Sequence, residues 1–185
     1  MNRTVAWVFL ALSLFLVVFP LPLPKPGLPA GLKSDEPAYY LMALSLAHDR
    51  DLRVEEKDID RLFAEFPFRK VDNLILMTDD GWRTVYYGKP YLYSLFAAPF
   101  AWLAGGNGLL AFNMLMLLGM VAAGGLFLGR ENPPWLAWTF SAGFFLLSNG
   151  FAYVFWLHPE IFNMAAVTGA LFFGLHRWKA EEAGG

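Results

Sequence analysis

The stretch YLYSLFAAPFAWLAGGNGLLAFNMLMLLGMVAAGGLFLG, residues 91–129, contains no charged residue. Apolar runs of this kind are typical of membrane-spanning helices, which need about 20 apolar residues to cross a bilayer. Pro99 and the sequence GGNG at residues 105–108 interrupt the run. These residues divide it into a short block at 91–104 and a longer block at 108–129.

The whole chain has the composition of a membrane protein. Of its 185 residues, 57% are hydrophobic and only 16% are charged, whereas soluble domains contain about 25% charged residues. The net charge of −2 and the absence of a basic stripe argue against a nucleic-acid partner. The sequence contains no cysteine, which excludes disulfides and thiolate metal sites. We therefore expect an integral membrane protein.

The basic residues decide which apolar blocks cross the membrane. If every block crossed it, with the N-terminus inside, Arg130 and the HRWK letters at 176–179 would lie outside, against the positive-inside rule. If the block at 91–104 is a juxtamembrane or re-entrant helix instead, both basic groups face the cytoplasm. We therefore predict an all-α integral membrane fold with N- and C-termini in the cytoplasm and four transmembrane helices, at 5–23, 108–129, 135–156 and 161–176.

The first apolar run is close to the length of a signal peptide, but no A-x-A cleavage pattern follows it. We expect it to be retained as a helix.

A long external loop is predicted at 24–107. It contains surface helices at about 36–48 and 91–104, the first with Tyr39, Met42, Ala43 and Leu46 along one face. Two β-prone runs around Asp79 and Asp80 predict a small hairpin. Residues 49–63 are interpreted as a solvated stretch of mixed charge. Residues 1–185 then form a single membrane module.

This topology places SDEPAYY (34–40) and LHPE (157–160) on the same side of the membrane. Acids and histidine beside apolar spans are costly unless they are paired or hydrated, so they are candidates for function. Structural interpretations also remain open. Ser34 or Asp35 can cap a helix, Glu160 can begin another after Pro159, and Lys89 can extend to the membrane interface.

Three blocks of sequence together resemble a known family. They are SDEPAYYLMALSLAHDRDL, DDGWRTVYYGKPYLYSLFAAPFAWLAGGNGLLAFN and FWLHPEIFNMAAVTGALFFG. In this order they are similar to the N-terminal module of C-type (polytopic membrane) glycosyltransferases, a superfamily that includes protein O-mannosyltransferases and aminoarabinose transferases. The resemblance implies transfer of a sugar from a polyprenyl-phosphate-type lipid to a glycan, lipid or protein acceptor, at the outer face of a bacterial cytoplasmic membrane.

Two departures from the family pattern are visible. Many relatives carry an arginine early in the second span, where this chain has Asn113. Such enzymes are also longer, with further spans. The chain is therefore expected to be an N-terminal fragment of a longer enzyme or one part of a split protein.

The resemblance also implies roles for individual residues. Asp35 and Glu36 match the catalytic acids, with Asp35 as the general base. Asp35 and Glu160 are the residues that would hold a divalent cation, Mg²⁺ or Mn²⁺. Contacts to the donor phosphate or substrate are expected from His158, Glu160, Lys89, Tyr39 and Tyr40.

Two non-enzymatic alternatives remain: a small membrane structural or partner protein, and a lipid-carrier-binding subunit of a split transferase. The enzyme hypothesis requires Asp35 and Glu160 to converge on one external cavity.

Overall fold

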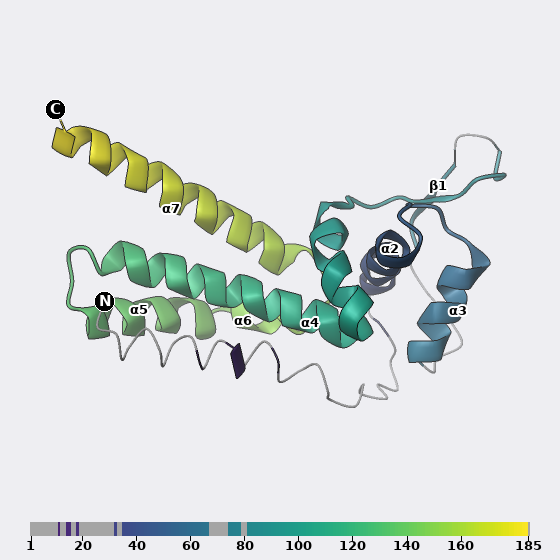
Figure 1. Cartoon of the computed structure of the whole chain (residues 1–185), viewed down its shortest axis with the longest axis horizontal. Helices are drawn as coiled ribbons and strands as arrows, with labels where there is room; N and C mark the ends of the chain where they lie inside the picture. Colours follow the sequence, from purple (N-terminus) through teal and green to yellow (C-terminus); the bar gives the residue numbers. More distant parts are fainter. Residues whose placement is uncertain are drawn as a thin grey trace. The chain divides into compact units, whose positions relative to one another are not determined.

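The computed structural model describes residues 11, 14, 15, 18, 32, 35–66, 74–78 and 81–184, without the side chains of 176–184. The described residues are mostly helical, with six helices and a two-stranded hairpin (Figure 1). The chain divides into two compact units. We call Val18–Phe112 with Trp156–His158 the loop unit, and Met1–Val17, Asn113–Phe155 and Pro159–Gly185 the helical unit.

Helix α2 (Glu36–His48) is the core of the loop unit. It is buried from Glu36 to Ser45 on every face, not only on the single face that the sequence predicted. The ring of Tyr39 packs edge-on against Tyr93, with centroids 5.8 Å apart. The Ser94 hydroxyl donates a hydrogen bond to the Tyr39 carbonyl at 2.9 Å. The helix can be buried on all its faces because few of its side chains are polar.

Helix α3 (Glu56–Glu65) lies in the stretch that was interpreted only as a solvated run of mixed charge; most of its residues are exposed or half-buried, but the helix itself was not predicted. A capping box starts the helix: the Glu55 backbone N–H donates to Asp58 Oδ2 at 3.0 Å, and the Glu55 side chain accepts from the Asp58 N–H. Asp58 and Leu62 are buried. Arg61 donates to both Asp49 and Asp58 and so connects the two acids.

The predicted hairpin is confirmed. Strands β1 (Leu76–Met77) and β2 (Tyr86–Tyr87) pair antiparallel, with Leu76 opposite Tyr87. The residues predicted for its turn, Asp79 and Asp80, lie outside the described residues. On the other side of β2, the Val54 N–H donates to the Val85 carbonyl at 2.8 Å.

Helix α4 (Leu92–Leu128) contains a break where the sequence predicted one. Ala104 and Gly105 have non-helical backbone angles and separate a segment at 92–103 from a segment at 106–128. Gly105 has φ 56° and ψ −133°, a conformation that favours glycine. The Glu65 Oε1 atom accepts a hydrogen bond from the Gly106 N–H at 2.7 Å and caps the second segment.

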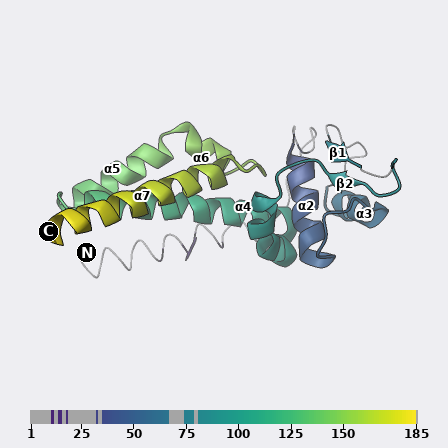
Figure 2. The ribbon, with the colours of Figure 1, turned by 90° about the horizontal axis from the view of Figure 1, so that it is seen from above.

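The helical unit contains the later part of α4 and three further helices: α5 (Pro134–Leu146), α6 (Asn149–Tyr153) and α7 (Glu160–Gly184). Figure 1 and Figure 2 together show α5 and α7 on either side of the later part of α4, and Figure 1 shows α7 diverging from α4 toward its C-terminal end. Phe145, Val154 and Ile161 pack against an apolar stripe of α4 between Met114 and Val121. Two buried side-chain bonds add to this core: Asn113 donates to the Val154 carbonyl at 3.2 Å and Ser141 to the Val121 carbonyl at 2.7 Å.

The predicted span at 135–156 is not one continuous helix, because α5 ends at Leu146 and α6 begins at Asn149. At this interruption the Ser148 hydroxyl provides hydrogen-bond partners for two backbone groups. It donates to the Phe145 carbonyl at the end of α5 at 3.0 Å and accepts from the Gly150 N–H at the start of α6 at 3.1 Å. Helix α5 alone is about 20 Å long, shorter than the roughly 30 Å of a bilayer core.

Among the described elements, α4 is the one helix long and apolar enough to cross a membrane by length and composition. The core helix of a soluble protein can meet the same criterion. The apolar part of α7, Glu160–Leu175, is shorter. The predicted span at 5–23 lies almost wholly outside the described residues.

The break in α4 leads to a first prediction. In Gly105→Ala, a Cβ at positive φ would overlap the Glu65 carboxylate, so we expect a loss of at least about 2 kcal/mol in the free energy of unfolding. Thermal unfolding in detergent, followed by circular dichroism, measures it. Gly119→Ala is the matched control, because a Cβ at this position of the same helix meets nothing within 4 Å. Equal unfolding temperatures for Gly105→Ala and wild type would contradict the proposed strain.

A second prediction concerns acid stability. The hydrogen bond from Arg61 holds the pKa of Asp49 below its ordinary value of 3.8. Asp49 therefore contributes stability above about pH 4, and this contribution is lost as the pH falls through the folded-state pKa. We expect Asp49→Asn to be less stable than wild type at pH 7 and to lose less stability between about pH 5 and pH 2.

Urea unfolding across this pH range measures the effect. Burial, and also the charge of Asp49, raise the pKa of Asp58, so the difference between the two pH profiles reports on Asp49 together with its effect on Asp58. Parallel pH profiles for the two proteins would contradict the assignment.

Candidate functional site

Asp35 and Lys89 form an ion pair in the loop unit, with Lys89 Nζ 2.6 Å from Asp35 Oδ2. Asp35 is the residue before α2, but its side chain makes no capping hydrogen bond. Its backbone carbonyl instead accepts from the N–H groups of Ala38 and Tyr39. The Asp35 and Lys89 side chains keep 29% and 17% of their surface exposed, respectively, so a ligand can reach the pair.

The two neighbouring acids have different surroundings. Glu36 is buried, with 9% exposure, and its Oε1 atom accepts a hydrogen bond from the Leu157 N–H at 3.0 Å. Residues 36 and 157 are far apart in sequence, and this bond ties the segment Trp156–His158 to the start of α2. Glu36 therefore has a structural role that the sequence did not reveal.

His158 lies among aromatic rings at the same end of α2. Its ring centroid is 6.0 Å from that of Tyr39 and 5.8 Å from that of Trp156. Like Glu36, His158 is buried. Five of the predicted site residues therefore belong to the loop unit around the start of α2: Asp35, Glu36, Tyr39, Lys89 and His158.

Two predicted residues have other surroundings. Tyr40 is fully buried and its hydroxyl donates to Glu65 Oε2. Burial, and secondly the Glu65 charge, raise the pKa of this phenol far above its ordinary value. Glu160 belongs to the helical unit, where it begins α7, and its Oε2 atom is buried. The helix start that the sequence left open for Glu160 is therefore present.

The residues around Asp35 do not fit a divalent cation. Mg²⁺ and Mn²⁺ prefer several oxygen ligands, whereas the Asp35 carboxylate is held by an ammonium group. In the part of the chain that the structure describes, no three His, Asp or Glu side chains are grouped so that they could hold a metal ion. We therefore assign no chemical step to a metal.

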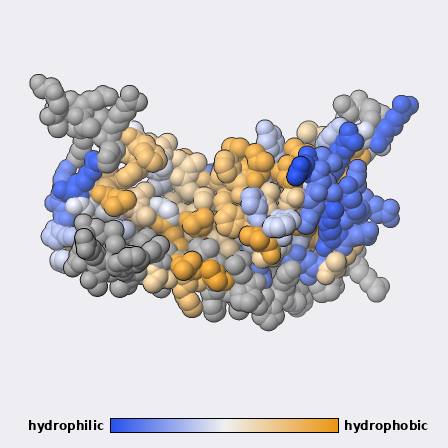
Figure 3. Space-filling view, viewed as in Figure 1, coloured by the Kyte–Doolittle hydropathy of each residue, from blue (hydrophilic) through white to orange (hydrophobic). Residues whose placement is uncertain are grey.

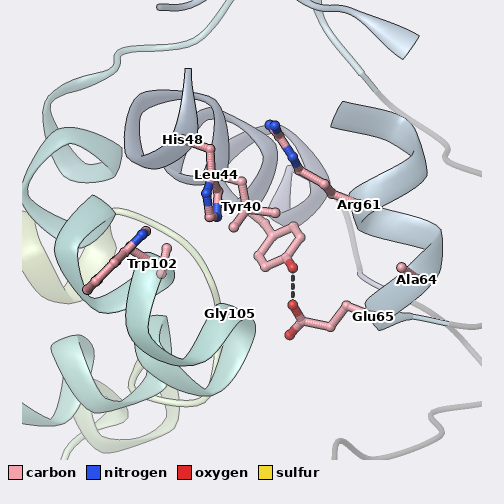
Figure 4. Close-up of a pocket in the computed structure, with 9 residues that line it drawn as sticks. Tyr40, Leu44, His48, Arg61, Ala64, Glu65, Trp102 and Gly105 are labelled. Atoms are coloured by element: carbon pink, nitrogen blue, oxygen red, sulfur yellow. Dashed lines mark hydrogen bonds between the residues drawn. The ribbon is translucent and has the colours of Figure 1, made fainter. Parts of the chain in front are cut away.

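A separate pocket of about 360 Å³ lies farther along α2. It is lined by residues of α2, α3 and the first segment of α4 (Figure 4). The lining side chains with polar groups are Tyr40, His48, Arg61, Glu65 and Trp102. Of these, only Tyr40 was predicted as a site residue; Arg61 and Glu65 were not, because the helical pattern of α3 was not recognised. The spacing of Ile59, Leu62 and Phe63 is the signal that could have predicted α3.

Comparison with protein-family models, curated proteins and solved structures gives no match.

The bond between Glu36 and the 156–158 segment gives a third prediction. In Glu36→Ala the buried Leu157 N–H loses its acceptor, and we expect a loss of about 1–3 kcal/mol in the free energy of unfolding. Glu36→Gln keeps an acceptor oxygen and should lose less. Thermal unfolding compares them, with Asp60→Ala as the control at an exposed acid. Equal stability of Glu36→Ala and Asp60→Ala would contradict the anchoring role.

Proposed function

We propose that this chain is a module of an integral membrane glycosyltransferase, which transfers a sugar from a polyprenyl-phosphate-type lipid to an acceptor at the outer membrane face. The observation that carries the proposal is that the loop unit contains both the Asp35–Lys89 ion pair at the start of α2 and His158, whose ring lies beside Tyr39 of the same helix. Asp35, Lys89 and His158 each come from a different one of the three sequence blocks that resemble the family. Their roles, the substrates and the membrane arrangement are all parts of the proposal.

The proposed reaction needs a base and positive charge. The Asp35 carboxylate accepts the proton of an acceptor hydroxyl as the hydroxyl oxygen attacks the anomeric carbon of the donor sugar. The bond between that carbon and the phosphate oxygen breaks, and the lipid phosphate leaves with the electron pair. Lys89, and a hydrogen bond from His158, stabilise the negative charge that develops on the phosphate. Glu36 is a positioning residue, because it fixes the segment that carries His158.

The surface of the helical unit supports a membrane location. Large apolar side chains are exposed on α5 and α7, among them Trp135, Phe140, Phe144 and Phe173. On the face shown in Figure 3, hydrophobic residues gather over the helical unit. Contiguous apolar surface of this kind is typical of contact with lipid or a partner. We propose that the segments at 5–23, 106–128, 134–153 and 160–175 cross the membrane, α5 and α6 together forming the third crossing.

A structural, non-enzymatic role is the second candidate, and one observation favours it. Lys89, which pairs with Asp35, and Leu157, which donates to Glu36, both lie within the loop unit, so both acids can act by holding its parts together. This candidate predicts that changing Asp35 lowers stability and that the wild-type protein transfers no sugar.

The fourth prediction separates these functions. With the full-length protein that contains this module in nanodiscs and a panel of radiolabelled polyprenyl-phosphate sugars, we expect transfer by wild type. Asp35→Asn should reduce it by about 10²–10⁴-fold, because the amide cannot accept the proton. Asp60→Asn is the control at an exposed acid of the same unit. Thermal unfolding of each variant shows whether the fold is retained.

Two results would overturn the assignment. One is a folded Asp35→Asn protein that transfers sugar at the wild-type rate. The other is a wild-type protein that transfers none of the donor sugars, which would support the structural candidate.

A further inference from the structure

The first segment of α4 has an exposed apolar face. Its buried side packs within the loop unit through Tyr93, Ala97 and Ala101. The residues on its other side recur at helical spacing and are exposed: Leu92, Leu95, Phe96, Pro99 and Leu103. Since this segment contains no charged residue, its exposed face is suited to lipid rather than to water.

Trp102 stands at the edge between this apolar face and the pocket shown in Figure 4. Its side chain is 63% exposed, and its position three residues after Pro99 places it next to the exposed apolar face. Trp102 also lines the pocket, together with Ala101 and Gly105. The polar pocket and the apolar face therefore share a border. An occupant that uses both surfaces must have a polar end and an apolar end.

The pocket presents charges of both signs. Arg61 already binds Asp49 and Asp58, but a guanidinium has five N–H donors and can also bind phosphate. Glu65 accepts from Tyr40 and Gly106, and a carboxylate has about four acceptor positions. The Glu65 carboxylate would repel a purely anionic ligand, and the Arg61 guanidinium would repel a purely cationic one. A zwitterion complements both charges.

His48 adds a polar group at the rim. It lies in the last turn of α2 and is exposed. Across the described residues, no hydrogen bond or ring contact engages its imidazole. This side chain can therefore bind an incoming phosphate without breaking an existing contact.

We propose that this pocket binds the headgroup of phosphatidylethanolamine, whose acyl chains lie along the exposed face of α4. Arg61 and His48 bind the phosphate, while Glu65 accepts hydrogen bonds from the ammonium group and Trp102 covers it. The ligand is an ethanolamine rather than a choline lipid, because the choline group has no N–H to donate to Glu65. The site rests on the proposed location of α4 at a membrane and does not depend on sugar transfer.

Native mass spectrometry of the delipidated protein in detergent tests the site, and this is the fifth prediction. We titrate phosphatidylethanolamine, phosphatidylcholine and phosphatidylglycerol of identical acyl chains, and a polyprenyl phosphate. We expect one phosphatidylethanolamine per chain, retained at least about tenfold more tightly than the other two phospholipids, a difference of about 1.4 kcal/mol. Trp102→Ala and His48→Ala should each weaken this binding at least fivefold.

Trp135→Ala is the matched control, because Trp135 is a similarly exposed tryptophan of the helical unit. Equal retention of the three phospholipids, or unchanged binding in Trp102→Ala, would overturn the site. Loss of polyprenyl-phosphate binding in these two variants, without loss of phosphatidylethanolamine binding, would assign the pocket to the sugar donor and also overturn it. Sugar transfer is measured separately, so failure of the proposed transferase leaves this result interpretable.

Discussion

The Glu65 carboxylate holds two parts of the loop unit together at the break in α4. It accepts from the Tyr40 hydroxyl on α2 and from the Gly106 N–H at the start of the second helical segment. The break needs this acceptor because the first N–H groups of a helix have no partner within the helix. It also needs glycine at position 105, where φ is positive and the carboxylate lies close. The end of α3, the core helix α2 and the long apolar helix are therefore connected by one side chain.

The candidate site illustrates how one pair of acids can divide structural and chemical roles. Glu36 is buried and bound to a backbone N–H, which suits an anchor. Asp35 is partly exposed and paired with a lysine, which suits a base that a substrate can reach. A helix start alone does not explain Asp35, because its side chain caps no N–H of α2. The proposed transferase and the structural alternative differ in whether the Asp35 carboxylate also acts on a substrate.

The pocket shows why polar residues can have different roles along one buried helix. At the start of α2, Asp35 and His158 belong to the proposed transfer site. Farther along α2, Tyr40 and His48 line a pocket that contains charges of both signs and borders an apolar face. Opposite charges in one pocket favour a zwitterion over a simple anion. The two sites can therefore be tested separately, with different ligands and variants.

The sequence by itself determined the features that depend on local pattern. Helical periodicity and the paired acids predicted the helix at 36–48, β-prone runs predicted the hairpin, and Pro99 with GGNG predicted the interruption of the long apolar stretch. Only the tertiary structure decided the features that depend on distant partners. One such feature is the burial of α2 on all its faces. Two others are the Asp35–Lys89 pair and the Glu36–Leu157 bond, which join residues 54 and 121 positions apart. The division of 134–153 into α5 and α6 depends on Ser148, a hydroxyl whose competition with backbone bonds is not visible in an apolar run. Hydrophobic pattern sets which segments are helical, but contacts distant in sequence set which polar groups meet.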